Sequence, residues 1–142
     1  MAGPVLSGNA RLVVGVGASR GVAYAEIDET LRAALADAGL SAAEVVTVAT
    51  VATKRDEPAV RALAEGLGAE LLDYAAEVLA AVAVPHPSPT VAAAVGTPSV
   101  AEAAALAATR GGELLIAKTR SRRRPSMCTI AVACHRVGGN RT

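Results

Sequence analysis

Short aliphatic runs alternate with amphipathic segments along most of the chain. Runs rich in valine, leucine, isoleucine and alanine predict buried strands at 11–16, 45–50, 70–73, 113–117 and 127–133. Between the first two runs, Ile27, Leu31 and Leu35 share one helical face, whereas Glu26 and Glu29 fall mostly off it. This spacing predicts an amphipathic helix whose glutamates lie largely outside its buried face.

Three further helices are predicted over about 58–67, 75–82 and 98–109, and a helix of one or two turns is predicted to end near Gly96. Gly39 and Gly68 follow two of the helical patterns, and glycine is typical of the position just after a helix. These positions therefore mark the expected ends of the first two helices.

The starts of two helices carry their own patterns. Thr53 or Asp56 is the expected N-cap of the second helix, and Pro58 suits its first turn. Ser99 and Glu102 form a capping-box pattern at the start of the last helix.

Strands and helices alternate over the first half of the chain, and two strands close it. Such alternation favours parallel strands joined by right-handed crossovers. The last two strands are separated by too few residues for a crossover helix, so we expect them to pair antiparallel. The expected fold class is α/β, a three-layer α/β/α domain with a mixed, mostly parallel sheet of about five strands. We expect a disordered lead at 1–10, this single domain at 11–137 and a tail at 138–142.

Composition narrows the class of protein. Of the 142 residues, 52% are hydrophobic, yet the chain contains no Phe and no Trp. The core must therefore consist of closely packed small aliphatic side chains, which favours helices lying tight on a sheet. A formal net charge of +1 provides no protein-wide field that would attract nucleic acid.

Neither a secretion signal nor a membrane span is evident in the sequence. The two cysteines, Cys128 and Cys134, fall on one face of a strand, too far apart for a disulfide or a shared metal. We therefore expect a cytoplasmic protein without a metal site and without membrane association.

The segment from Gly15 to Gly21 is the first candidate ligand site. It follows the first strand, at the edge of the sheet where parallel α/β folds bind ligands. Gly15, Gly17, Ser19, Arg20 and Gly21 are the expected contacts, and backbone N–H groups in such a turn favour anions. The alternative is a tight turn that needs glycine only for its backbone geometry.

The same turn partly resembles the cofactor loop of short-chain dehydrogenases. The pattern fails at Ala23, where that family has its last glycine. The second strand also lacks an acidic residue at its end, which would bind the ribose of the cofactor. Neither Tyr24 nor Tyr74 has the lysine four residues on that the catalytic tyrosine of that family requires. We therefore predict no nicotinamide and no other cofactor.

A charged segment follows the second strand and opens on the same edge of the sheet. Lys54, Asp56 and Glu57 are candidate ligand contacts, and Lys54 and Glu57 are also candidates for acid–base chemistry. The alternative is a solvated helix start whose carboxylates suit the helix dipole. Sequence alone does not assign catalytic residues.

The strongest cluster of positive charge runs from Lys118 to Arg124, in the expected loop between the last two strands. Lys118 and Arg120 are candidate contacts for an anionic small molecule, because cationic side chains bind carboxylates and phosphates. A solvated loop and a nucleic-acid contact are the alternatives. The nucleic-acid interpretation is disfavoured, because the aromatic platforms that stack bases are missing.

Together these landmarks resemble the CobE/CbiG C-terminal family of cobalamin biosynthesis over about 11–137. Four stretches carry the resemblance in order and spacing: 13–17 with Arg20 and Gly21, 54–58, 95–106 and 113–118. The third, VGTPSVAEAAAL, is the most specific, and its Ser99 and Glu102 join the candidate ligand contacts.

The resemblance implies a role in corrin-ring assembly, with a precorrin or corrinoid as ligand and other cobalamin-pathway enzymes as partners. CbiG proteins join such a domain to further N-terminal sequence and open a ring lactone of a cobalt-precorrin, releasing a two-carbon aldehyde. The free-standing CobE proteins imply binding or handling of an intermediate, which is the primary hypothesis. A lactone-opening hydrolase is the alternative, followed by an arginine-loop module for nucleic acid or protein. Whether the chain is an enzyme stays open, and a homo-oligomer is compatible with each hypothesis.

Overall fold

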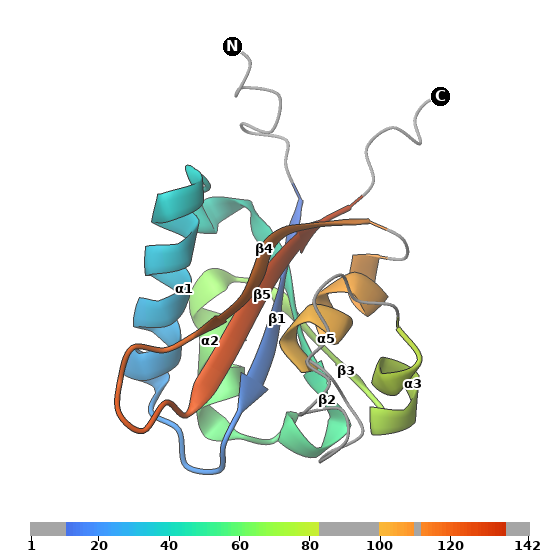
Figure 1. Cartoon of the computed structure of the whole chain (residues 1–142), viewed down its shortest axis with the longest axis horizontal. Helices are drawn as coiled ribbons and strands as arrows, with labels where there is room; N and C mark the ends of the chain where they lie inside the picture. The colour runs from blue at the N-terminus through green and yellow to red at the C-terminus, as the bar shows by residue number, and fades with distance from the viewer. Residues whose placement is uncertain (1–10, 83–99, 110–111, 136–142) are drawn as a thin grey trace.

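The computed structural model of the protein describes residues 11–82, 100–109 and 112–135. The strands of its central sheet are β1 (Leu12–Ala18), β2 (Val45–Val51), β3 (Glu70–Tyr74), β4 (Glu113–Arg120) and β5 (Cys128–Cys134). They lie in the order β3-β2-β1-β5-β4 (Figure 1). Parallel pairing joins β1, β2 and β3, whereas β5 is antiparallel to both β1 and β4, which confirms the predicted mixed sheet. The expected lead at 1–10 and tail at 138–142 lie outside the described residues.

Helices cover both faces of this sheet. They are α1 (Tyr24–Ala38), α2 (Pro58–Leu67), α3 (Ala76–Ala80) and α5 (Val100–Thr109). α1 and α2 lie on one face, while α3 and α5 lie on the other, so the predicted three layers are confirmed (Figure 1). α3 is shorter than the helix predicted at 75–82. The longest helix of the described ranges, α1, has 15 residues, and none there is long and apolar enough to cross a membrane.

α5 packs against β1 more closely than a side chain on the strand would allow. A Cβ atom on Gly15 would lie 1.9 Å from the carbonyl oxygen of Ala101 and 2.8 Å from the amide nitrogen of Ala105. Ala101, Ala104 and Ala105 are all buried. One glycine and several alanines therefore let the helix rest on the backbone of the strand, as the small-residue composition predicted.

β4 is longer than predicted, because Lys118 and Arg120 belong to the strand rather than to the following loop. The register between β4 and β5 shifts between Ile116 and Thr119, where β4 carries one extra residue in a bulge. The amide of Lys118 lies in this bulge and donates a hydrogen bond of 2.8 Å to Oε2 of Glu102. Pairing with β5 resumes beyond the bulge, which extends the strand into the basic segment.

The start of α2 also differs from the prediction. Its N-cap is Glu57 rather than Thr53 or Asp56, and no side chain caps it by a hydrogen bond. A single 3-10 turn, η3 (Ala52–Lys54), follows β2 directly and delays the helix. The predicted helix ends are confirmed, since Gly39 and Gly68 follow α1 and α2 with φ of 72° and 68°.

Candidate functional site

Two loops that the sequence assigned to a ligand site meet at one edge of the sheet. Since β1 and β2 are parallel neighbours, the loops that follow them emerge together at the carboxyl ends of these strands. There the backbone amide of Gly21 donates a hydrogen bond of 2.8 Å to Oε2 of Glu57, 36 positions away in the sequence. We call Ser19–Gly21 together with Lys54–Glu57 the carboxyl-end site.

The backbone amides of the glycine turn are mostly bonded within the protein. Gly21 donates to Glu57, Ser19 donates to the carbonyl oxygen of Met127 at 2.8 Å, and Val22 donates to that of Ser19 at 3.2 Å. Gly21 itself has a φ of 80°, which favours glycine. The expectation that backbone N–H groups hold an anion is therefore revised, and side chains are the better candidates.

The charged side chains of the carboxyl-end site differ in their pairing. Arg55 and Asp56 form ion pairs with residues of β3 and α2, respectively. Arg20 and Lys54 make no ion pair with any residue that the structure describes. Apart from these ion pairs, the positive charges of Arg20 and Lys54 accompany the carboxylate of Glu57, an arrangement that attracts an anionic ligand.

Other candidate contacts lie apart from this site. Gly15 lies beneath α5, and Glu102 is fully buried with one oxygen bonded to β4, so both residues have structural roles. Gly17 is partly buried, and a Cβ there would lie 3.6 Å from the side chain of Val100, an ordinary contact. Ser99 lies outside the described residues.

Lys118 and Arg120 are exposed on β4, which β5 separates from β1. Neighbouring strands are about 4.8 Å apart, so β4 lies about 10 Å from β1 across the sheet. Arg120 lines a pocket beside α1 instead, together with Arg122. These two candidates therefore lie two strands away from the glycine turn.

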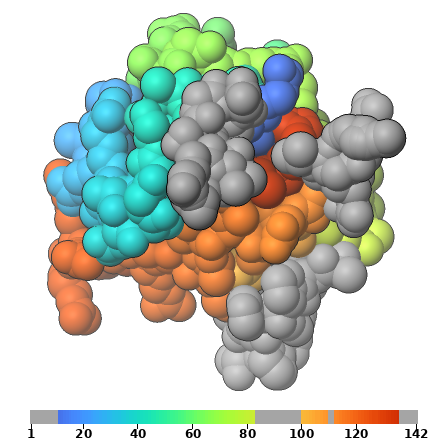
Figure 2. All heavy atoms as spheres, turned by 90° about the horizontal axis from the view of Figure 1, so that it is seen from above, coloured from blue at the N-terminus to red at the C-terminus, as the bar shows by residue number. Residues whose placement is uncertain are grey.

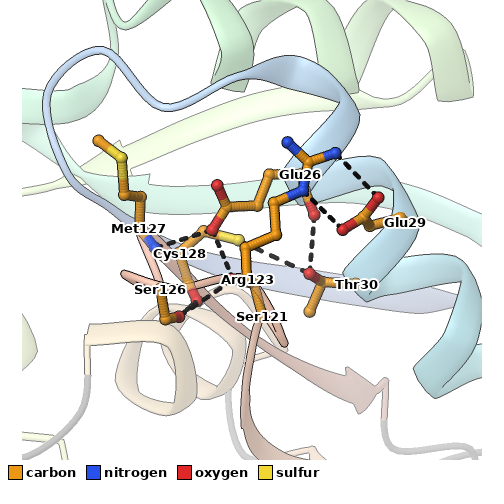
Figure 3. Close-up of polar contacts among 8 residues, drawn as sticks. All are labelled: Glu26, Glu29, Thr30, Ser121, Arg123, Ser126, Met127 and Cys128. Carbon is orange, nitrogen blue, oxygen red and sulfur yellow. Dashed lines mark hydrogen bonds and ion pairs between the residues drawn. The ribbon is translucent and has the colours of Figure 1, made fainter.

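A buried carboxylate anchors the β4–β5 hairpin to α1 (Figure 3). Oε2 of Glu26 accepts hydrogen bonds from the hydroxyl of Ser121 and, at 2.8 Å, from the amide of Met127. These bonds, the Ser121 hydroxyl foremost, lower the pKa of Glu26 from its ordinary value of 4.5. The prediction that Glu26 lies off the buried face was wrong, because the hairpin covers the first turn of α1.

A second contact fixes the same hairpin. Nε and Nη2 of Arg123 donate hydrogen bonds of 2.8 and 3.0 Å to the two carboxylate oxygens of Glu29 (Figure 3). The paired bonds lower the pKa of Glu29 and raise that of Arg123. One arginine of the basic segment is therefore committed to structure, which weakens the nucleic-acid alternative.

Both cysteines are buried, and neither forms a disulfide. Burial raises the pKa of the Cys128 and Cys134 thiols, which disfavours the reactive thiolate form. Across the described ranges, no three His, Cys, Asp or Glu residues cluster in a way that could hold a metal ion.

The sequence matches the family described as the cobalamin synthesis G C-terminus over residues 12–133. The cobalt-precorrin-5A hydrolase of Priestia megaterium is 30% identical over 122 residues, which cover 86% of this chain and 32% of that protein. The chain thus spans about a third of the length of this relative.

Two solved structures of similar size share the fold. CobE, a protein from the cobalamin (vitamin B12) biosynthetic pathway, is 33% identical with a TM-score of 0.73, covering 91% of this chain and 96% of CobE. The cobalamin biosynthesis protein chiG from Agrobacterium tumefaciens str. C58 is 31% identical with a TM-score of 0.62, covering 87% and 98% of the two chains. These matches confirm the resemblance found in the sequence, and the chain belongs to the cobalamin synthesis G C-terminus family.

Proposed function

We propose that this protein binds a precorrin or corrinoid intermediate of cobalamin biosynthesis at the carboxyl-end site, through the peripheral carboxylates of the ligand. The observation that carries the proposal is the hydrogen bond between Gly21 and Glu57, which joins the loops that bear Arg20 and Lys54. Membership of a cobalamin synthesis family and similarity to CobE support the choice of ligand class.

The charge of the site suits this ligand class. Tetrapyrrole intermediates of the pathway are polycarboxylates, so they require several cations around a surface that also accepts a flat apolar ring. Arg20 offers paired donors to a carboxylate, whereas Lys54 offers a compact positive charge. Glu57 opposes an anion, but its carboxylate is already bonded to Gly21, and the two cations outnumber it.

A spectral titration tests this proposal. The purified protein is titrated at low salt with a cobalt-precorrin or a stable corrinoid, whose absorption reports the environment of the ring. Replacing one cation, in Arg20→Gln or Lys54→Met, is expected to raise the Kd about tenfold, because each variant removes one charge-assisted contact.

Arg32→Gln is the matched control, since Arg32 is an exposed arginine already paired with Asp28 on α1. This variant should keep the Kd within about twofold of the original, as exposed paired charges contribute little. The proposal fails if the original protein gives no saturable spectral change, or if Arg32→Gln weakens binding as much as Arg20→Gln does.

A second candidate function is a hydrolytic step on a cobalt-precorrin. The relative named cobalt-precorrin-5A hydrolase favours it, and Lys54 and Glu57 supply an acid and a base within the carboxyl-end site. The residues matched here correspond to 32% of that protein, so this candidate assigns them part of a hydrolase.

Turnover separates the two functions. Glu57→Gln and Lys54→Met are compared with the original protein for release of a two-carbon aldehyde from a cobalt-precorrin and for binding of the same substrate. Aldehyde release that falls at least about a hundredfold while the Kd stays within threefold assigns acid–base chemistry to these residues. If aldehyde release and substrate affinity fall together, Lys54 and Glu57 contribute to binding alone.

A further inference from the structure

A pocket of about 250 Å³ lies between α1 and the end of β4, on the far side of β5 from the glycine turn. In the space-filling view, the surface of α1 (blue to cyan) borders that of β4 and the hairpin that follows it (orange) (Figure 2). The pocket is lined by Glu29, Thr30, Ala33, Ala34, Asp37, Thr119, Arg120 and Arg122.

Helical spacing shapes one wall of the pocket. Glu29, Ala33 and Asp37 recur every four residues, so they form a single stripe along α1. The small side chains of Ala33 and Ala34 leave room between the helix and the strand. An engineered apolar cavity of about 150 Å³ holds benzene, so a volume of 250 Å³ suits a ligand of about ten non-hydrogen atoms. The pocket is therefore too small for a tetrapyrrole ring.

The charges that line the pocket do not cancel. Arg120 and Arg122 make no ion pair with any residue of the described ranges. Of the two carboxylates on the α1 wall, Glu29 is bonded through both oxygens to Arg123, outside the lining. Only Asp37 offsets the two guanidinium groups, so the pocket carries an excess of positive charge.

The backbone that carries Arg122 is anchored to α1 on both sides. Arg122 lies between Ser121 and Arg123 in the sequence. Figure 3 shows the bonds of these two neighbours, from Ser121 to Glu26 and from Arg123 to Glu29. Anchors on both sides restrict the backbone of Arg122. A binding site formed in advance costs less conformational entropy when a ligand binds.

We propose that this pocket is a separate site for a small organic anion, in which Arg120 and Arg122 hold a carboxylate or phosphate group and Ala33 and Ala34 contact a short aliphatic body. The site is distinct from the carboxyl-end site and does not depend on the proposed corrinoid function. Guanidinium groups bind both kinds of anion through paired hydrogen bonds, so the shared chemistry defines the ligand class.

Titration with inorganic phosphate and with propionate, followed by amide NMR shifts at constant ionic strength, tests the proposal. We expect saturable shifts at residues of α1 and β4 that line the pocket, with a Kd of about 1 mM for the better anion. The double variant Arg120→Gln with Arg122→Gln should weaken this binding at least about tenfold. Preference for phosphate or for propionate identifies which of the two anions the natural ligand carries.

Matched variants keep the test specific. Arg124→Gln removes an exposed arginine of the same hairpin that does not line the pocket, and it should change the Kd less than about twofold. Asp37→Asn should strengthen binding about two- to threefold, because it removes the opposing carboxylate. Lys54→Met should leave phosphate binding unchanged, which separates this site from the corrinoid proposal.

Three results would overturn the proposal. One is a linear shift without saturation up to about 20 mM of either anion. Another is equal loss of affinity in Arg124→Gln and in the double variant, because that outcome indicates general charge attraction. The third is weaker phosphate binding in Asp37→Asn, which contradicts an electrostatic role for the arginines opposite it.

Discussion

The two helical layers cover the same sheet but approach it differently. α5 rests on β1 so closely that no Cβ atom fits at Gly15, and alanines fill the contact. On the opposite face, α1 contributes larger side chains such as Ile27 and Leu31, and it admits the carboxylate of Glu26. The pocket beside β4 also lies on the α1 side.

The difference shows where this fold leaves room for ligands. The contact of α5 with β1 at Gly15 leaves no spare volume for a ligand. The interface below α1 combines buried hydrogen bonds with charges that remain available, namely those of Arg120 and Arg122. Small residues thus let α5 pack closely on β1, whereas the α1 layer leaves a pocket lined by charged side chains.

The largest expected effect comes from adding one methyl group to the tight layer. In Gly15→Ala, the new Cβ atom would lie 1.9 Å from the carbonyl oxygen of Ala101, and backbone atoms cannot rotate away. α5 must then shift, which we expect to lower the free energy of unfolding by about 3 kcal/mol. Urea denaturation followed by circular dichroism measures this loss.

Gly17→Ala provides the matched control on the same strand. Its Cβ atom would meet Val100 at 3.6 Å, an ordinary contact distance. We expect a change within about 0.5 kcal/mol. Similar losses for the two variants would show that α5 adapts readily, and the contrast between the layers would disappear.

A smaller effect, confined to acid pH, is expected from the anchor below α1. Glu26 has a lowered pKa in the folded protein, so its stabilising contribution is present above pH 4.5 and is lost as the pH falls further. Glu26→Gln should therefore lower the Tm at pH 7 and show a smaller further loss of Tm between pH 5 and pH 3 than the original protein does. Calorimetry across this pH range measures both changes.

Glu65→Gln is the control for this experiment, because Glu65 is an exposed glutamate of α2 outside the hairpin anchor. Its Tm should follow that of the original protein across the pH range. If Glu26→Gln also behaves like the original protein, the carboxylate does not stabilise the hairpin through its charge.

Local patterns explain why much of the fold was predictable. Aliphatic runs located all five strands, and Gly39 and Gly68 located two helix ends. The meeting of the glycine turn with Glu57 was also predictable, since parallel neighbouring strands direct their following loops to one edge.

Contacts between distant segments explain what the sequence did not reveal. Glu26 and Ser121 are 95 residues apart, and neither has a local pattern that indicates the other. Helical periodicity placed Glu26 outside the buried face because it considers only the contact between the helix and the sheet. It does not include a later hairpin that packs over the first turn of the helix. In the same way, charge alone suggested a loop at Lys118, although pairing with β5 extends the strand through it.

The smallest expected effect on the free energy of unfolding comes from removing single buried hydroxyl groups on the α1 side of the sheet. Thr30 and Thr50 are both buried, and each donates its hydroxyl proton to a backbone carbonyl, at 2.7 Å to Glu26 and at 2.8 Å to Val16. The hydrogen bond of Thr30 stays within α1, and the carbonyl of Glu26 can also accept the backbone N–H of the next helical turn. The hydrogen bond of Thr50 instead links β2 to β1. Thr50→Val should therefore cost about 1 kcal/mol and Thr30→Val about half as much, since the net contribution of a hydrogen bond is modest.

Urea denaturation of the two threonine variants measures this difference, and the double variant Thr30→Val with Glu26→Gln measures coupling between the neighbouring polar groups. Additive losses would mean that the anchor consists of Glu26 and its bonds to the hairpin alone. The contrary outcome is that Thr30→Val lowers the free energy of unfolding more than Thr50→Val does, by an amount that depends on Glu26. In that case the polar atoms below α1 act as one network. The α1 layer would then be as intolerant of change as the α5 layer, because of its hydrogen bonds rather than its close packing.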